Sequence, residues 1–177
     1  MRVITGNYKG RRFEIPRTFK ARPTTDFAKE NIFNVMNGYV DFDDATALDL
    51  FAGTGSISLE LLSRGCREVV SVELDRQHAA FISQCIAKVG ADMESVLIKG
   101  DALKYIKACH RQFDIIFADP PYALPELPTI PELILSSDML AEGGLLVFEH
   151  GKNNDFSQHP RFINHREYGS VNFSIFR

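Results

Sequence analysis

Short apolar runs alternate along this chain with amphipathic segments of helical period. The apolar runs are rich in strand-forming residues and lie at residues 48–51, 69–73, 96–98, 115–118 and 145–148. Between two of them, Ala79, Ile82, Ile86 and Val89 recur on one helical face and stop at Gly90, and the helical segment 56–64 likewise ends at Gly65. Strands separated by helices of this length predict right-handed βαβ units, and hence an α/β fold whose mainly parallel sheet is covered on both faces.

The two ends of the chain depart from this alternation. Residues 2–4 and 12–15 predict a small N-terminal β-hairpin about a turn at residues 7–10, followed by a helix that ends near Gly38. Residues 162–165 and 171–176 predict a closing antiparallel hairpin. We therefore expect a mostly parallel seven-stranded sheet with an antiparallel C-terminal hairpin. Residues 1–177 form one domain in this interpretation, with residues 1–22 as an N-terminal hairpin and basic arm.

Composition narrows the class of protein. With 177 residues, 45% of them hydrophobic and 24% charged, the chain is expected to build one core. It has no apolar run of membrane-spanning length, and its start lacks the stages of a signal peptide, so we expect a cytoplasmic protein without a membrane partner. Cys66, Cys85 and Cys109 are too few and too scattered for a disulfide framework or a zinc site, and no metal is expected.

Four acids follow the ends of successive predicted strands. Asp49, Glu73, Asp101 and Asp119 are placed where open α/β sheets bind their ligands. Helix capping alone explains one or two of them, but not all four. In nucleotide-binding folds, an acid at the end of the second strand binds ribose hydroxyls, and the spacing between Asp49 and Glu73 is close to the spacing that this role requires. A glycine turn, residues 51–56, adds Gly53 and Gly55, which allow the backbone a close approach to a ligand.

The acids decide between two cofactors. A dinucleotide brings a pyrophosphate, which favours a third glycine and no neighbouring acid, whereas Ser58 stands at the third glycine position here. S-adenosylmethionine carries a sulfonium and an ammonium, a ribose for Glu73, and an adenine amine that Asp101 can accept. The sequence therefore favours S-adenosylmethionine over NAD. The cofactor-binding residues that we expect are Asp49, Phe51, Gly53, Gly55, Glu73, Asp101 and Ala102.

The tetrapeptide Asp119-Pro120-Pro121-Tyr122 closes the fourth apolar run. Two prolines remove two backbone donors, so the loop offers a carboxylate and carbonyl acceptors, together with an aromatic face. This combination suits a planar base with an exocyclic amine. Asp119 and the Pro120 carbonyl are expected to accept the two N–H groups, and Tyr122 to stack on a base swung out of its helix or loop. In the alternative interpretation Tyr122 covers the core and the prolines stiffen the loop.

Charge is unevenly distributed along the chain. Residues 1–30 hold eight basic and three acidic residues, a net of +5, so the remainder carries −8 of the total −3. A basic arm on an acidic body is typical of a protein that binds phosphate, although a solvated surface explains the same charges equally well. The candidates for RNA contact are Arg11, Arg12, Arg17, Lys20, Arg22 and Lys29.

These motifs together resemble a known family. Residues 48–55 and Asp119-Pro120-Pro121-Tyr122 are similar to Rossmann-like class I S-adenosylmethionine-dependent methyltransferases of exocyclic amines. The resemblance extends over the whole chain to the RsmD family, in the hairpin of residues 2–10, in Arg22-Pro23-Thr24, in residues 61–65 and in Tyr168-Gly169. Two positions depart from that family, since Phe27 and Lys29 stand where arginine is usual.

The resemblance implies a function and leaves two alternatives. RsmD proteins methylate the guanine N2 amine of 16S rRNA at the nucleotide numbered 966, so it implies 16S rRNA or a small-subunit assembly intermediate as partner, and we favour a monomer. Another amine, on DNA adenine or a protein glutamine, is an alternative, although glutamine enzymes resemble Asn-Pro-Pro-Tyr more. A non-catalytic binding module is the second alternative. The five histidines have no assigned function, and Glu149 is either a strand-end cap or a support behind the site.

Overall fold

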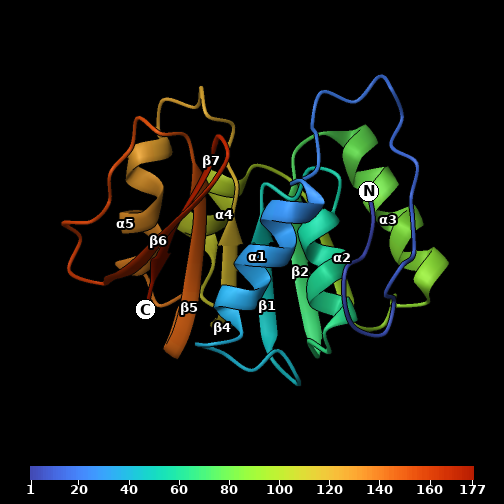
Figure 1. The fold of residues 1–177 in the computed structure, drawn as a ribbon, viewed down its shortest axis with the longest axis horizontal. Helices are drawn as coiled ribbons and strands as arrows, with labels where there is room; N and C mark the ends of the chain where they lie inside the picture. Colours follow the sequence, from blue (N-terminus) through green and yellow to red (C-terminus); the bar gives the residue numbers. More distant parts are fainter.

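The computed structural model describes all residues from Met1 to Arg177 and confirms the expected α/β fold (Figure 1). Every apolar run that the sequence marks as a strand is a strand, and both glycine-terminated helices end where expected. The elements, in chain order, are α1 (Asp26–Met36), β1 (Thr46–Leu50), α2 (Ser56–Ser63), β2 (Glu68–Glu73), α3 (Arg76–Val89), β3 (Ser95–Lys99), α4 (Ala102–Ala108), β4 (Phe113–Ala118), the 3₁₀ turn η1 (Leu127–Thr129), α5 (Ile130–Leu135), β5 (Leu140–His150), β6 (Phe162–Tyr168) and β7 (Val171–Phe176).

The seven strands form one sheet in the order β3-β2-β1-β4-β5-β7-β6. Strands β1 to β5 pair in parallel, and β7 pairs antiparallel with both β5 and β6. The chain builds outward from β1 to β3 and then returns to place β4 on the other side of β1. Because the crossovers leave in opposite directions from β1 and β4, a crevice opens between their carboxyl ends, which is where such sheets bind ligands.

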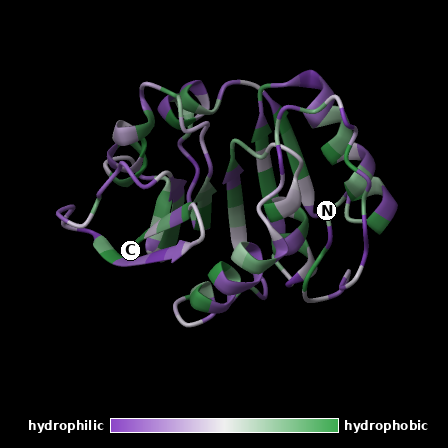
Figure 2. Cartoon of the chain, turned by 45° about the horizontal axis from the view of Figure 1, so that its top comes forward, coloured by the Kyte–Doolittle hydropathy of each residue, from purple (hydrophilic) through white to green (hydrophobic).

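Helices cover both faces of the sheet, as the continuous apolar strands require. Alternate residues of each strand point to opposite sides, so that Ala47, Phe117 and Val147 join the core under α1, α2 and α3. Their neighbours Leu48 and Ile116 join the core under α4 and α5. Figure 2 shows hydrophobic colours concentrated in the central strands and hydrophilic colours on the connecting loops. No helix is long and apolar enough to cross a membrane.

The predicted N-terminal hairpin is present in reduced form. A single antiparallel bridge joins Arg2 to Arg12, and the flanking backbone bonds, such as Val3 N to Arg11 O at 3.0 Å, hold the two arms together. In Figure 1 this segment, coloured dark blue, runs beside α2 and α3. At its turn, Gly6 has φ of +90°, and a Cβ there would lie 1.9 Å from the carbonyl oxygen of Ser63. Only glycine lets the hairpin approach α2 this closely.

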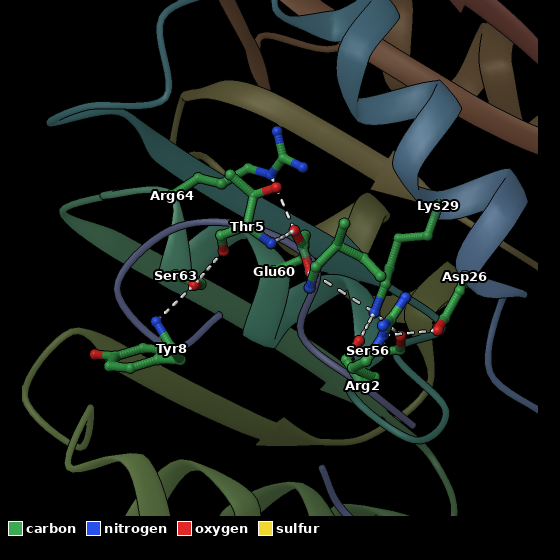
Figure 3. A network of polar contacts seen from close by, with 10 residues as sticks. Arg2, Thr5, Tyr8, Asp26, Lys29, Ser56, Glu60, Ser63 and Arg64 are labelled. Atoms are coloured by element: carbon green, nitrogen blue, oxygen red, sulfur yellow. Dashed lines mark hydrogen bonds and ion pairs between the residues drawn. The ribbon is translucent and has the colours of Figure 1, made fainter. Parts of the chain in front are cut away.

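A buried acid on α2 fastens the hairpin to the domain (Figure 3). The carboxylate of Glu60, fully buried, accepts from the backbone N–H of Ile4 at 2.8 Å and of Thr5 at 3.0 Å. It also pairs with the Arg64 guanidinium at 3.1 Å and lies 3.7 Å from Lys29 Nζ. A buried carboxylate needs this many donors to offset its desolvation.

The prediction that Lys29 contacts RNA phosphate is wrong. Lys29 is only 1% exposed, and its ammonium donates to the carbonyl of Arg2 at 2.5 Å and to Ser56 Oγ at 3.0 Å. It therefore ties α1 to the hairpin and to the first residue of α2. Burial lowers its pKa, and the nearby Glu60 carboxylate opposes that effect.

Candidate active site

A cavity of about 1170 Å³ opens at the carboxyl ends of the parallel strands. Three parts of the chain surround it: the glycine turn after β1, the ends of β2 and β4 with the loops that follow them, and the segment between the hairpin and α1. In Figure 1 that segment, drawn in blue, rises above α3 and comes down to the start of α1. Every expected cofactor-binding and catalytic residue except Gly55 lines this cavity, namely Asp49, Phe51, Gly53, Glu73, Asp101, Ala102, Asp119, Pro120 and Tyr122.

The glycine turn has the left-handed backbone that its sequence predicts. Gly53 and Gly55 have φ of +57° and +79°, and a Cβ at Gly55 would lie 2.9 Å from Ile82 Cγ1. Gly55 thus serves the packing of α2 against α3, and Gly53 faces the cavity. Phe51 also has φ of +61°, which costs a non-glycine residue about 1 kcal/mol or more. The sequence gives no sign of this strained residue, whose half-buried ring lies against the cavity.

Glu73, the last residue of β2, holds the glycine turn in place. Its Oε2 accepts from the backbone N–H of Gly53 at 2.6 Å, and its Oε1 accepts from the N–H of Asp75 at 3.0 Å. Each carboxylate oxygen has a second lone pair. Glu73 can therefore accept hydroxyl groups from a ligand in the cavity while it fixes the turn that would face that ligand.

Asp49 lies one residue before the end of β1 rather than just past it, which corrects the predicted position. The side chain is 1% exposed, and Ser58 on α2 donates its hydroxyl to Oδ2 at 2.6 Å. Burial raises the pKa of Asp49 to about 7, although the hydrogen bonds from Ser58 oppose the shift. A ligand that brings positive charge to this wall would restore the ionised form.

Asp101 does two things at once. Its Oδ1 accepts from the backbone N–H groups of Leu103 at 2.8 Å and Lys104 at 3.1 Å, and so caps α4. The capping alternative is therefore correct for this acid. Asp101 also lines the cavity, beside the buried Ala102 at the first position of α4.

Asp119 and Pro120 form the cavity wall directly after β4. The backbone N–H of Asp119 donates to Leu50 O at 3.3 Å, and no backbone N–H donates to the carbonyl of Pro120. Burial raises the pKa of the Asp119 carboxyl well above its usual range, and the neighbouring acids Glu149 and Asp49 raise it further. The pair of residues thus offers an amine two acceptors at the wall of the cavity.

Tyr122 is held with its ring facing the cavity. The side chain is 48% exposed, and its hydroxyl donates to Glu149 Oε1 at 3.0 Å. Gly151 lies against the other side, since a Cβ at that glycine would come within 3.3 Å of the ring. A ring this exposed does not cover the core, and one fixed at both ends can serve as a stacking surface.

The remaining basic residues fall into two groups. Arg11, Arg12 and Arg17 are exposed on the hairpin and the segment after it, and Arg11 donates to the carbonyl of Lys88 at the end of α3 at 2.9 Å. Lys20 and Arg22 are exposed at the wall of the cavity.

Two residues that line the cavity had no predicted role. Thr24 lines the cavity and lies within hydrogen-bonding reach of Glu149. His78 also lines it, with Nδ1 3.8 Å from Glu73 Oε1 and its ring 4.5 Å from that of Phe19. The position of Thr24 depends on how the segment between the hairpin and α1 crosses the sheet, which no local pattern encodes, whereas His78 lies in the first turn of α3. No group of three or more His, Cys, Asp or Glu side chains is arranged to hold a metal ion.

The strand order and this line of acids define a Rossmann-like methyltransferase. Solved structures support the assignment: the one titled "Putative methyltransferase yhhF from Escherichia coli" aligns with a TM-score of 0.85 at 26% identity, over 99% of this chain and 96% of that one. The chain belongs to the family described as "Conserved hypothetical protein 95", whose model matches residues 1–177. This is the RsmD family to which the sequence shows resemblance.

Two relatives carry more informative names. The Bacillus subtilis protein "Putative rRNA methyltransferase YlbH" is 36% identical over 155 residues, which cover 86% of this chain and 83% of the relative. The Escherichia coli protein "Ribosomal RNA small subunit methyltransferase D" is 29% identical over 180 positions, which cover all of this chain and 89% of the relative. Both alignments include the catalytic and cofactor-binding candidates described above.

Proposed function

We propose that this protein transfers a methyl group from S-adenosylmethionine to the exocyclic N2 amine of a guanine in 16S rRNA, at the nucleotide numbered 966. The observation that carries the proposal is the wall formed by Asp119 and Pro120, where a half-buried carboxyl group and a free carbonyl stand together at the edge of the cavity. The names of the two relatives support rRNA as the substrate class and the small subunit as its source.

The residues of the cavity fit S-adenosylmethionine. The cofactor supplies an electrophilic methyl group on a sulfonium. Asp49 offers negative charge in a buried position, and Glu73 retains acceptor capacity for ribose hydroxyls. Gly53 presents its backbone to the cavity without a side chain. A pyrophosphate-bearing cofactor would instead bring further negative charge to a wall of acids, namely Asp49, Glu73 and Asp119, which disfavours its binding.

Asp119 and Pro120 would prepare the amine for attack. The lone pair of a guanine amine is delocalised into the ring, so the nitrogen is a weak nucleophile. Acceptors on both of its N–H groups favour a tetrahedral nitrogen with the lone pair aimed into the cavity. The Asp119 carboxylate also stabilises the positive charge that develops on nitrogen. Tyr122 would hold the base flat while this happens, and the base must leave its stack to reach this depth.

Methyl transfer by the purified protein tests the proposal. We expect tritiated S-adenosylmethionine to label 16S rRNA or a small-subunit assembly particle that lacks the modification, and digestion to yield N2-methylguanosine. Guanosine nucleoside, DNA and a glutamine peptide serve as matched substrates and should remain unlabelled. Label recovered in N6-methyladenine or methylglutamine would instead support another amine, and no transfer to any substrate would support a binding module.

Replacing Asp119 by alanine separates catalysis from cofactor binding. We expect the turnover number to fall by about 10²–10⁴ while the dissociation constant for S-adenosylmethionine stays within a few-fold of the unmodified protein, because Asp119 acts on the nucleophile. Isothermal titration with the cofactor and single-turnover labelling measure the two quantities. An equal loss of cofactor binding would show that Asp119 belongs to the cofactor site instead.

A further inference from the structure

Glu149 is a buried acid beside Asp119 for which the proposed chemistry has no task. It lies on β5, where Ile115–Ala118 of β4 pair in parallel register with Leu145–Phe148. That register puts Glu149 next to Asp119, on the same face of the sheet. Glu149 is only 6% exposed, so its carboxyl group has little access to water.

The contacts of Glu149 leave one oxygen unsatisfied. Oε1 accepts from the Tyr122 hydroxyl at 3.0 Å, whereas the buried Oε2 accepts no hydrogen bond, although the Thr24 hydroxyl lies near the carboxyl group. Asp119 lies within hydrogen-bonding reach of the same carboxyl group. Two neighbouring ionised carboxylates repel, all the more because Glu149 is shielded from water, and a buried oxygen without a donor is costly. A proton held between the two acids removes both problems.

We propose that Glu149 is a positioning residue, which takes up the single proton of an Asp119–Glu149 carboxyl pair so that Asp119 meets the amine as an unprotonated carboxylate. The inference rests on the proposed function. In the step itself an O–H bond on Asp119 breaks and one on Glu149 forms, so no further reactant is needed. The same acid fixes Tyr122, and thus links the acceptor of the amine to the surface that stacks on the base.

The surroundings keep the proton on the pair. Three groups surround the carboxyl pair. Asp49 faces the pair from β1, the Tyr122 hydroxyl faces it from the loop after β4, and the uncharged Phe173 on β7 lies opposite Glu149. No Lys, Arg or His forms an ion pair with either acid. Burial raises the pKa of Glu149 to about 7, and burial together with the charge of Glu149 raises that of Asp119. The two protons therefore leave in separate steps that belong to the pair.

Two substitutions distinguish this role from a structural one. Glu149→Gln keeps the size of the side chain, donates an amide N–H toward Asp119 and still accepts from Tyr122, so it imitates the protonated acid. We expect its turnover number to stay within about threefold at pH 7.5, and its decline at acidic pH to stay within about one pH unit of that of the unmodified protein, because Glu149 is already uncharged in the proposed active form. Glu149→Leu offers neither donor nor acceptor and should lose activity about tenfold or more.

Glu142→Gln is the matched control, because Glu142 lies on the same strand with its side chain exposed. It should change neither the turnover number nor the pH profile. An acidic decline in Glu149→Gln that is displaced by more than about one pH unit from that of the unmodified protein would overturn the proposal. So would full activity in Glu149→Leu.

A second measurement needs no methyl transfer. Carboxyl ¹³C NMR of the protein without ligands, with Asp119→Asn and Glu149→Gln used for assignment, follows each acid as pH is varied. In the unmodified protein we expect two separate titration steps that both shift the Asp119 signal, and in Glu149→Gln we expect only one step, at the lower of the two pH values. A single step with the same midpoint in both proteins would refute the pair. If the unmodified protein methylates no RNA, the proposed function fails while this titration still decides whether the two acids share a proton. If Glu149→Leu does not fold, Glu149→Gln alone decides.

Discussion

Lys29 offers a sharp test of how the hairpin is attached, because the sequence and the structure give it different roles. If Lys29 contacted phosphate, its loss would weaken RNA binding and change the free energy of unfolding little. If Lys29 is a buried ammonium between α1, the hairpin and α2, its loss should lower the free energy of unfolding and leave the salt dependence of RNA binding unchanged. Lys29→Met keeps the length of the side chain and removes the charge and the donors.

The size of the effect follows from the contacts. Lys29 Nζ lies 2.5 Å from Arg2 O, 3.0 Å from Ser56 Oγ and 3.7 Å from Glu60 Oε2. Removing one partner of a buried ion pair costs about 3–5 kcal/mol, because the other charge is left without compensation. Arg64 still pairs with Glu60 at 3.1 Å, so the lower end applies, and we expect a loss of about 3 kcal/mol in the free energy of unfolding. For a chain of this length that corresponds to roughly 6–12 °C in Tm.

Urea unfolding gives the free energy, and hydrogen exchange at Ile4 and Thr5, whose N–H groups bind Glu60, reports the hairpin directly. Lys20→Met is the matched control, since Lys20 is an exposed lysine at the cavity. It should weaken RNA binding and leave stability within about 0.5 kcal/mol. A Lys29→Met protein of normal stability but reduced salt dependence of RNA binding would refute this account of Lys29.

The remaining predictions concern the basic arm and a buried acid. Reversing the charges of Arg11 and Arg12 to glutamate should weaken RNA binding and reduce the slope of log K against log salt by about 1.4, since each lost contact with single-stranded phosphate contributes about 0.7; an unchanged slope in filter binding would exclude them from the interface. Asp49 has a pKa raised to about 7 in the folded protein, so it holds its proton more tightly when folded, and its contribution to stability is full below pH ~4 and is lost as pH rises toward 7. Ionisation of Asp49 should therefore lower the free energy of unfolding of the unmodified protein by up to about 4 kcal/mol between pH 4.5 and pH 8, and Asp49→Asn should lack this loss. Parallel curves of the free energy of unfolding against pH for the two proteins would contradict this.

Most of the fold is predictable because apolar runs and glycine stops are local signals. The strand at residues 145–148 was predicted too short, since β5 begins at Leu140 and runs through Gly143 and Gly144, which interrupt the strand pattern. Helix α5 (Ile130–Leu135) went unpredicted because Pro131 and the prolines before it are typical of loops. Pro131 is tolerated because it stands in the first turn, where its missing N–H has no partner to lose.

The misplaced residues of the site are those whose environment is set by distant elements. The burial of Lys29 is predictable from the sequence, because Lys29 shares one face of α1 with Ile32, Phe33 and Met36, and that face is buried. A lysine there needs a buried acid, and Glu60, on a helix buried along its whole length, is that acid. The orphan oxygen of Glu149 and the strained backbone of Phe51 have no counterpart in sequence, because each arises from how neighbouring strands end.

The central claim is that the acids at the strand ends place a methyl donor beside a guanine amine of 16S rRNA. Mass-spectrometric mapping of 16S rRNA nucleosides tests it most directly, in cells that lack this protein and in the same cells supplied with it or with Asp119→Ala. We predict that N2-methylguanosine at position 966 disappears with the protein, returns with the unmodified chain and does not return with Asp119→Ala. An unchanged methylation map in cells without the protein would contradict the claim.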